Sequence, residues 1–341
     1  MTHHNVKLPS LKSNVFCQIL ATDEIELLKL ERDAGRIGNI LSIYVLPCIV
    51  LPGILLNGVS CLVFTSSDLK KLSSSVYIFA LLVSDTGVLL GLFIVWLEAV
   101  DFKINHVNGV CQGLVFSTYT FSFLSVWYVV CVTVENYITI CHPCRIKTMC
   151  TRRRATVTCL CVFVASVFLY GATPFAAEVR YSEDGNFGIC SERPEFRRFM
   201  QAFTYVDSLL TLLVPLIAIS CMLIGLVLSI VHAARWKKRM GTKRCAHRPK
   251  NAQVRVTRML FALSVSYVVM NAPSHVTRLY YLIRTANVLG GEEENRGCQL
   301  TYTEGLINLM LQYVTYAHSA GKFWIFLLFS KNFTKNLTRL I

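Results

Sequence analysis

Seven long apolar segments run through this chain, and few folds can accommodate that pattern. Five of them contain no Asp, Glu, Lys or Arg: residues 37–67, 104–134, 155–177, 208–234 and 259–277. Two more carry a single charge inside, Asp85 in 72–97 and Lys322 in 305–330. A helix needs about 20 mostly apolar residues to cross the hydrocarbon core of a bilayer. The sequence therefore predicts an all-α membrane protein with a bundle of seven transmembrane helices.

Positive charge between the segments lies on alternate connections. Residues 142–154 hold five Lys or Arg and no acid, and residues 235–258 hold ten and no acid. An excess of Lys and Arg marks the cytoplasmic side of a membrane. We therefore expect a multi-pass plasma-membrane protein with its N-terminus outside and its C-terminus in the cytoplasm. The net charge of +14 comes mostly from this excess on the cytoplasmic connections. It indicates attraction to anionic lipid and to a cytosolic partner rather than binding of nucleic acid.

The seven spans divide the chain into three parts. Residues 1–36 are polar and lack the apolar core of a signal peptide, so we expect an extracellular N-terminal segment. Residues 37–330 form the bundle, and residues 331–341 remain as a cytoplasmic tail. The spans use nearly all of the chain, which leaves no room for a separate soluble domain.

Four cysteines fall on the side assigned to the outside: Cys17, Cys111, Cys190 and Cys298. An even number in an oxidising compartment suggests two disulfides, for which three pairings are possible. No Cys/His metal spacing occurs, and no HExxH, GxSxG or P-loop pattern is present. We therefore expect no metal, no cofactor and no enzymatic activity.

Several marker residues sit at a recurring family spacing. They are Asn57, Leu81 with Asp85, Cys111, the run Glu135–Asn136–Tyr137, three prolines (Pro174, Pro215 and Pro273) and Phe333. With these, residues 40–335 or so resemble the rhodopsin-class G-protein-coupled receptors. The run from Asn271 to His275, together with Phe333, looks most like invertebrate neuropeptide receptors of the FMRFamide/myosuppressin type. The resemblance implies a seven-helix bundle with a short amphipathic helix after the last span.

That resemblance implies an extracellular ligand, which we expect to be a peptide, and a heterotrimeric G-protein partner. Among the three disulfide pairings we favour Cys111 with Cys190 and Cys17 with Cys298. The residues at the family's ligand-binding positions are Trp96, Thr118, Tyr119, Ser122, Asp207, Ser274, His275, Arg278, Asn308, Gln312 and Tyr316. Amine receptors of the family need an aspartate where Thr118 stands, so an amine ligand is disfavoured. Asp207 pairs either with a basic group of the ligand or internally with Arg278.

A second predicted site lies in mid-membrane and comprises Asn57, Asp85, Ser125, His318, Ser319 and Lys322. An ionisable group at that depth is costly and usually functional. In the family this aspartate holds a sodium ion, but here Lys322 replaces the helix-7 asparagine. We hypothesise that the Lys322 ammonium takes the place of sodium and pairs with Asp85. In the alternative, Lys322 extends to the cytosolic interface and leaves Asp85 with sodium or a proton.

The departures from the family pattern cluster on its signalling half. Asn136 stands where the family has an arginine that meets the G protein, and Leu223 and Phe326 replace two tyrosines. By resemblance the residues that face the G protein are Glu135, Asn136, Tyr137, Arg145, Arg152, Arg153, Arg154, Arg255 and Arg258. In the alternative, the basic residues of this set only fix the orientation of the chain in the membrane. Two readings remain open: a receptor that couples to G proteins, and a binding-only receptor that sequesters ligand or modifies a partner. A channel or transporter is disfavoured, because no inverted repeat is present.

Overall fold

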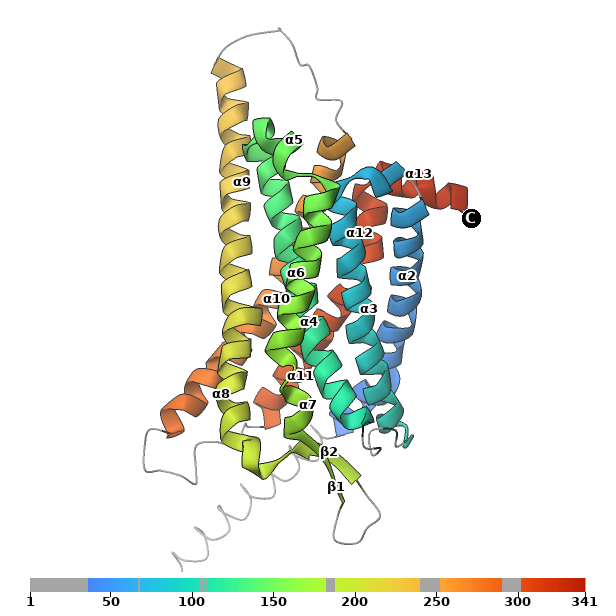
Figure 1. The fold of residues 1–341 in the computed structure, drawn as a ribbon, viewed down its shortest axis with the longest axis vertical. Helices are drawn as coiled ribbons and strands as arrows, with labels where there is room; N and C mark the ends of the chain where they lie inside the picture. Colours follow the sequence, from blue (N-terminus) through green and yellow to red (C-terminus); the bar gives the residue numbers. More distant parts are fainter. Residues whose placement is uncertain are drawn as a thin grey trace, which may run out of the picture.

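The computed structural model describes residues 36–66, 68–102, 104, 107, 109–181, 188–239, 252–289 and 302–340. Long helices run side by side along the length of the molecule, with a two-stranded hairpin at one end (Figure 1). Within the described ranges, six helices are long and apolar enough to cross a membrane: Arg36–Thr65, Ser73–Ala99, Val110–Cys141, Arg152–Ala176, Pro194–Trp236 and Val256–Tyr281. Each of them overlaps one of the first six apolar segments.

The main helices of the first six spans are α2 (Leu46–Ser66), α3 (Ser73–Ala99), α4 (Val110–Cys141), α6 (Arg152–Tyr170), α9 (Val214–Arg239) and α10 (Ala252–Leu289). Two π-helical turns interrupt this pattern, η1 (Leu41–Val45) before α2 and η6 (Leu209–Leu213) between α8 (Arg197–Ser208) and α9. Short elements connect the spans: η2 (Asp68–Lys71), η4 (Pro143–Arg145), α5 (Ile146–Met149), α7 (Thr173–Ala176) and η5 (Pro194–Phe196). Several helices extend past the apolar segments, such as α4 to Cys141 and α10 to Leu289.

The seventh apolar segment forms two consecutive helices rather than one. Helix α11 (Tyr302–Ala320) ends at Gly321, and α12 (Lys322–Phe329) begins directly after it. The Gly321 amide donates to the carbonyls of Ala317 and His318, at 2.8 and 3.3 Å. A Cβ at Gly321 would lie 2.9 Å from the Ala317 oxygen, so the tight turn suits glycine. The break places Lys322 in the first turn of α12.

A short helix follows the last span, as the resemblance implied. Helix α13 (Lys331–Leu340) buries one face, with Phe333 fully buried and Leu337 at 8% exposure. The Phe333 ring lies 5.5 Å from that of Phe64 and 5.6 Å from that of Phe326, measured between centroids. This aromatic cluster fixes α13 against α2 and α12, and the helix leaves the bundle at the end opposite the hairpin (Figure 1). The expected fold class, a seven-helix membrane bundle, is confirmed.

The hairpin is formed by β1 (Ala177–Tyr181) and β2 (Gly188–Glu192), which pair antiparallel with Val179 opposite Cys190. Cys190 is joined to Cys111 in the first turn of α4 by a disulfide, with the two Cα atoms 5.6 Å apart. This expected pairing is confirmed. The second expected bridge, between Cys17 and Cys298, lies outside the described residues. The Cys111–Cys190 bridge holds the hairpin across one end of the bundle.

Candidate functional site

A buried ion pair joins α3 to α12 in the middle of the bundle. The Lys322 ammonium donates to Asp85 Oδ2 at 2.5 Å, and the Ser125 hydroxyl donates to Asp85 Oδ1 at 2.6 Å. Asp85 is fully buried, and 1% of the Lys322 side chain is exposed. The structure thus has the arrangement of our first hypothesis, and Lys322 does not extend to the interface. Each charge has its partner, which is the condition under which buried charges are tolerated.

Polar contacts extend from this pair toward α2 and α10. Asn57 donates its amide to the Ser319 carbonyl at 3.3 Å. The His318 ring lies one turn before Lys322 and is 4% exposed, with Nε2 3.3 Å from the Ser266 hydroxyl and Nδ1 3.4 Å from the Asn271 amide nitrogen. The six residues predicted for the mid-membrane site therefore come together, and α10 adds Ser266 and Asn271 to them.

A cavity of about 390 Å³ lies between this network and the hairpin end of the bundle, among α4, η6, α10 and α11. Its wall runs from Tyr281 and Asn308, near the hairpin end of the bundle, to His318 and Ser319 beside the ion pair. Seven of the eleven predicted ligand-binding residues line it: Ser122, Ser274, His275, Arg278, Asn308, Gln312 and Tyr316. Ligand sites are concave and hold convergent polar groups that fix the orientation of the ligand, and most of the side chains that line this cavity are polar. The cavity is the candidate functional site.

Four predicted ligand-binding residues are not among those that line this cavity. Trp96 donates its indole N–H to the Ile43 carbonyl at 3.1 Å and packs among apolar residues. Thr118 is exposed on α4. Tyr119 stacks on Tyr170 with centroids 5.6 Å apart. A ligand role for these residues stays a prediction.

Asp207, the fourth of them, is committed to two partners inside the protein. The Tyr170 hydroxyl donates to Asp207 Oδ1 at 2.7 Å, and Arg278 donates to Oδ2 at 3.2 Å. The Asp207 side chain is 5% exposed, whereas that of Arg278 is 43% exposed. The structure therefore has the internal pair, and Arg278 keeps an open side that also lines the cavity.

The opposite end of the bundle carries the predicted G-protein-facing residues. Glu135 is 4% exposed and accepts from the hydroxyls of Ser73 and Ser74 at 2.6 and 2.8 Å. Asn136 is fully buried, and among the described residues neither its amide nitrogen nor its amide oxygen has a hydrogen-bond partner. Tyr137 lies against Gly225 and packs edge-on against the His142 ring. Glu135 and Asn136 thus face the interior here rather than a cytosolic surface.

The basic residues of that end are exposed. Arg145, Arg152, Arg153, Arg154 and Arg258 all reach solvent. Arg152 donates to the Lys70 carbonyl at 2.5 Å, which ties the start of α6 to η2. The side chain of Arg255 lies outside the described ones. These arginines form a cationic surface around the end of the bundle where α13 begins.

Sequence reasoning missed several residues of the site, and the signals for them were weak. Ser266 and Tyr267 carry none of the family markers, yet Ser266 contacts His318 and the Tyr267 hydroxyl lies 3.3 Å from His275 Nε2. A serine or tyrosine in an apolar segment is common, so only its contacts reveal a role. Tyr170 also lies in an apolar segment, and its partner Asp207 is 37 residues away in the chain.

Comparison with known proteins places the chain in a family. The model described as "7 transmembrane receptor (rhodopsin family)" matches residues 56–320. The neuromedin U receptor homolog nmur-2 of Caenorhabditis elegans is 24% identical over 263 residues, which cover 70% of this chain and 64% of that protein. Neuromedin-U receptor 2 of Homo sapiens is 28% identical over 253 residues, covering 70% and 59%. The B1 bradykinin receptor of Chlorocebus aethiops is 25% identical over 267 residues, covering 76% and 70%.

The chain thus spans about three fifths of the length of the neuromedin U receptors that it matches. The finer likeness to FMRFamide- and myosuppressin-type receptors stays a prediction. The family match covers all residues that line the cavity and more than half of the chain, and it ends two residues before Lys322. The chain is therefore a multi-pass membrane protein that belongs to the rhodopsin family of seven-transmembrane receptors.

Proposed function

We propose that this chain is a plasma-membrane receptor that binds an extracellular peptide and signals through heterotrimeric G proteins. Its N-terminus would lie outside, because the connections rich in Lys and Arg, 142–154 and 235–258, would then face the cytoplasm. The match to the rhodopsin family supports the receptor role. Relatives named for neuromedin U and for bradykinin support a peptide as the class of ligand.

The observation that carries the proposal is the cavity between α4, η6, α10 and α11. It brings amide, hydroxyl, imidazole and guanidinium groups from α4, α10 and α11 together in one cavity. A peptide end presents backbone donors and acceptors and a side chain or terminus to be matched by such groups. The exposed part of Arg278 gives the cavity a cation, which suits a carboxylate or a carbonyl oxygen of the peptide.

Substitutions at Asp207 and Arg278 test whether the peptide binds in this cavity. We expect Arg278→Ala to reduce peptide potency by about tenfold or more, because a charged hydrogen bond contributes about 1.5–3 kcal/mol. Asp207→Asn should reduce potency less, since it acts by holding Arg278. Dose–response curves of a cell-surface assay give both values, with Glu195→Gln on the exposed η5 turn as the matched control. Unchanged potency in both variants would mean that the peptide binds elsewhere.

A second candidate function is that of a receptor that binds its ligand without activating a G protein. The burial of Asn136, with both amide atoms unpartnered, favours it. Asn136 has neither the reach nor the charge of the arginine that the family pattern expects there, and Leu223 and Phe326 lack the hydroxyl groups of the two expected tyrosines. In the family pattern the arginine meets the G protein and the two tyrosines hold it there.

One experiment separates the two candidates. The unmodified chain and its Asn136→Arg variant are expressed in cells, and calcium and second messengers are measured against a library of neuropeptides. A response from both supports a signalling receptor and names its ligand class. A response from the Asn136→Arg variant alone supports the binding-only function. If neither responds while both reach the cell surface, the peptide proposal fails.

A further inference from the structure

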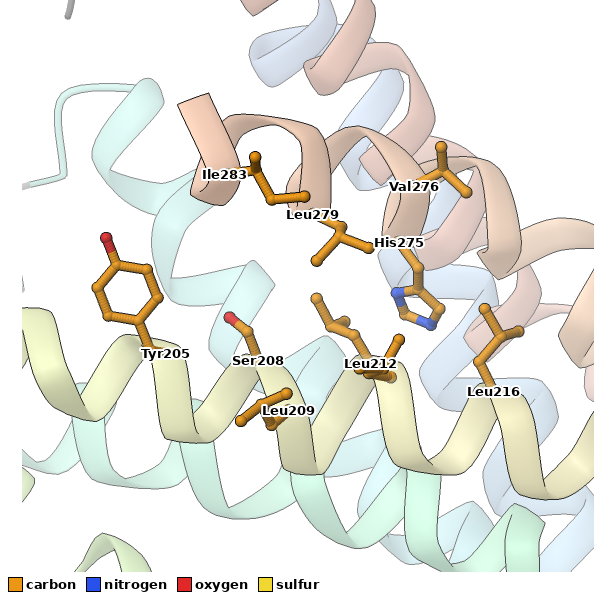
Figure 2. A pocket seen from close by; sticks show the side chains of 10 residues that line it. Tyr205, Ser208, Leu209, Leu212, Leu216, His275, Val276, Leu279 and Ile283 are labelled. Atoms are coloured by element: carbon orange, nitrogen blue, oxygen red, sulfur yellow. The ribbon is translucent and has the colours of Figure 1, made fainter. Parts of the chain in front are cut away.

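A second cavity, separate from the peptide site, lies on the flank of the bundle between η6 and α10. We call it the lateral groove. It has a volume of about 300 Å³, at the lower end of the usual range for ligand sites. Its ten lining residues are Tyr205, Ser208, Leu209, Leu212, Leu213, Leu216, His275, Val276, Leu279 and Ile283. Figure 2 shows the two helices facing each other with these side chains between them.

The groove faces the surroundings of the bundle rather than its interior. Leu209, Val276 and Ile283 are 50, 62 and 53% exposed. Seven of the ten lining residues are Leu, Val or Ile. In a protein of this family that flank lies in the hydrocarbon of the bilayer, where no water can fill a recess. The occupant must therefore come from the membrane.

The two ends of the groove lie at different depths in the bundle. Tyr205 lies at one end and Leu216 at the other (Figure 2). Three lining residues are polar: His275 on α10, nearer Leu216, and Tyr205 and Ser208 on α8. Helix α8 stands toward the end of the bundle that carries the hairpin, where tyrosines favour the membrane–water interface. Leu216 comes eleven positions after Tyr205 along the helix, which corresponds to about 16 Å. That distance is close to half of the roughly 30 Å hydrocarbon core, the depth that one leaflet occupies.

From these observations we propose that the lateral groove binds one acyl chain of a membrane lipid, with the lipid head beside Tyr205 and the chain end near Leu216. Hydrocarbon has no solvent-driven preference for an apolar surface within a bilayer. A recess nevertheless favours a chain, because side chains contact it from two sides and dispersion contacts accumulate. The π-helical turn Leu209–Leu213 supplies three lining leucines, and such turns occur frequently at functional sites.

The groove shares two wall residues with the peptide cavity. Leu212 and His275 line both. His275 is held from the interior by Tyr267, whose hydroxyl lies 3.3 Å from its Nε2. An acyl chain in the groove would therefore press on the same two side chains that border the peptide cavity.

Photo-crosslinking tests the proposal on the full chain in lipid nanodiscs, without a peptide. The probe is a phosphatidylcholine with a diazirine near the end of one acyl chain, and labelled residues are mapped by mass spectrometry. We expect labelling of Leu212, Leu216 and Leu279 to exceed that of Leu55 and Leu228, two exposed leucines that do not line the groove, by about fivefold. Labelling that simply follows exposure around the bundle would overturn the proposal.

A variant that fills the groove gives the second arm. Leu279→Trp should reduce groove labelling about fivefold, whereas Leu228→Trp should leave it unchanged. Circular dichroism and size-exclusion chromatography check that both variants fold, and Val276→Phe replaces Leu279→Trp if the latter does not. A sterol diazirine that labels the groove and displaces the acyl probe would overturn the assignment to an acyl chain. Because the readout is labelling, it stands or falls separately from peptide binding.

Discussion

At the scale of single residues, the central feature is the Lys322 ammonium, a cation of the chain's own that lies beside the buried Asp85 carboxylate. Asp85 is paired with Lys322 and with the Ser125 hydroxyl in a site closed to solvent. A carboxylate alone at that depth would favour a bound cation or a proton. Because the lysine side chain already provides the cation, we infer that this protein does not need sodium at this position.

Replacing either member of the pair should destabilise the protein by about 3–5 kcal/mol, because each change strands a buried charge. We expect Asp85→Asn to lower the Tm the most, since Lys322 has no second carboxylate in the contacts that the structure shows. The double change Asp85→Asn with Lys322→Asn should recover part of the loss. Thermal unfolding in detergent measures all three, and a double variant no better than the worse single one would contradict the pairing.

Sodium sensitivity is a separate consequence of the same residue. In Lys322→Asn the Asp85 carboxylate is left with the Ser125 hydroxyl and space for a cation, so we expect its Tm to rise when sodium chloride replaces choline chloride. The unmodified protein should show no such difference. A strong sodium dependence in the unmodified protein would mean that Lys322 does not take the place of the ion.

At the scale of elements, helix packing depends on a few glycines whose surroundings differ sharply. A Cβ at Gly87 in α3 would lie 2.4 Å from the Phe121 ring of α4, which is closer than a real contact allows. A Cβ at Gly58 in α2 would meet nothing within 4 Å. The two positions therefore separate the steric role of glycine from its low helix propensity.

We expect Gly87→Ala to destabilise the protein by about 1–3 kcal/mol, because α3 and α4 must move apart or the Phe121 ring must shift. Gly58→Ala serves as the matched control and should be neutral or stabilising by up to about 1 kcal/mol, because alanine favours a helix over glycine. Thermal unfolding compares the two. Equal effects would show that close contact between α3 and α4 is not what requires glycine at Gly87.

At the scale of the whole molecule, the orientation in the membrane that we propose from the charge pattern can be tested by cysteine labelling. Cys144 is exposed and Cys150 half-buried on the connection between α4 and α6. Burial raises the pKa of the Cys150 thiol above its usual value, with the Glu135 charge adding to the effect. A higher pKa leaves less thiolate, the reactive form, at neutral pH.

A membrane-impermeant maleimide should therefore label Cys144 only after the cells are permeabilised, in a chain whose Cys17, Cys245 and Cys298 are serine. Cys150 should react more slowly than Cys144. The ratio of the Cys144 labelling rate to the Cys150 labelling rate should fall as the pH is raised from 7 toward 9. The Cys144→Ser variant gives the labelling that remains without the Cys144 thiol, which serves as the background. Labelling of Cys144 in intact cells would reverse the proposed orientation.

The sequence by itself determined the spans, because a bilayer requires about 20 apolar residues per helix and the chain has such segments. It also determined the family markers and, from the family pattern, the bridge between Cys111 and Cys190. Most residues of the mid-membrane site and of the cavity could be named in advance, since their positions along each helix follow from the family pattern. The Asp85–Lys322 contact remained one of two alternatives, because nothing local decides where a long side chain points.

Only the tertiary structure decided contacts between distant parts of the chain. Asp85 and Lys322 are 237 residues apart, and whether the lysine reaches inward depends on the break at Gly321. The same holds for the internal partners of Asp207, for the buried and unpartnered Asn136, and for the lateral groove between η6 and α10. Each arises where two helices meet, and the apolar pattern of one helix does not specify which side chains of another will face it.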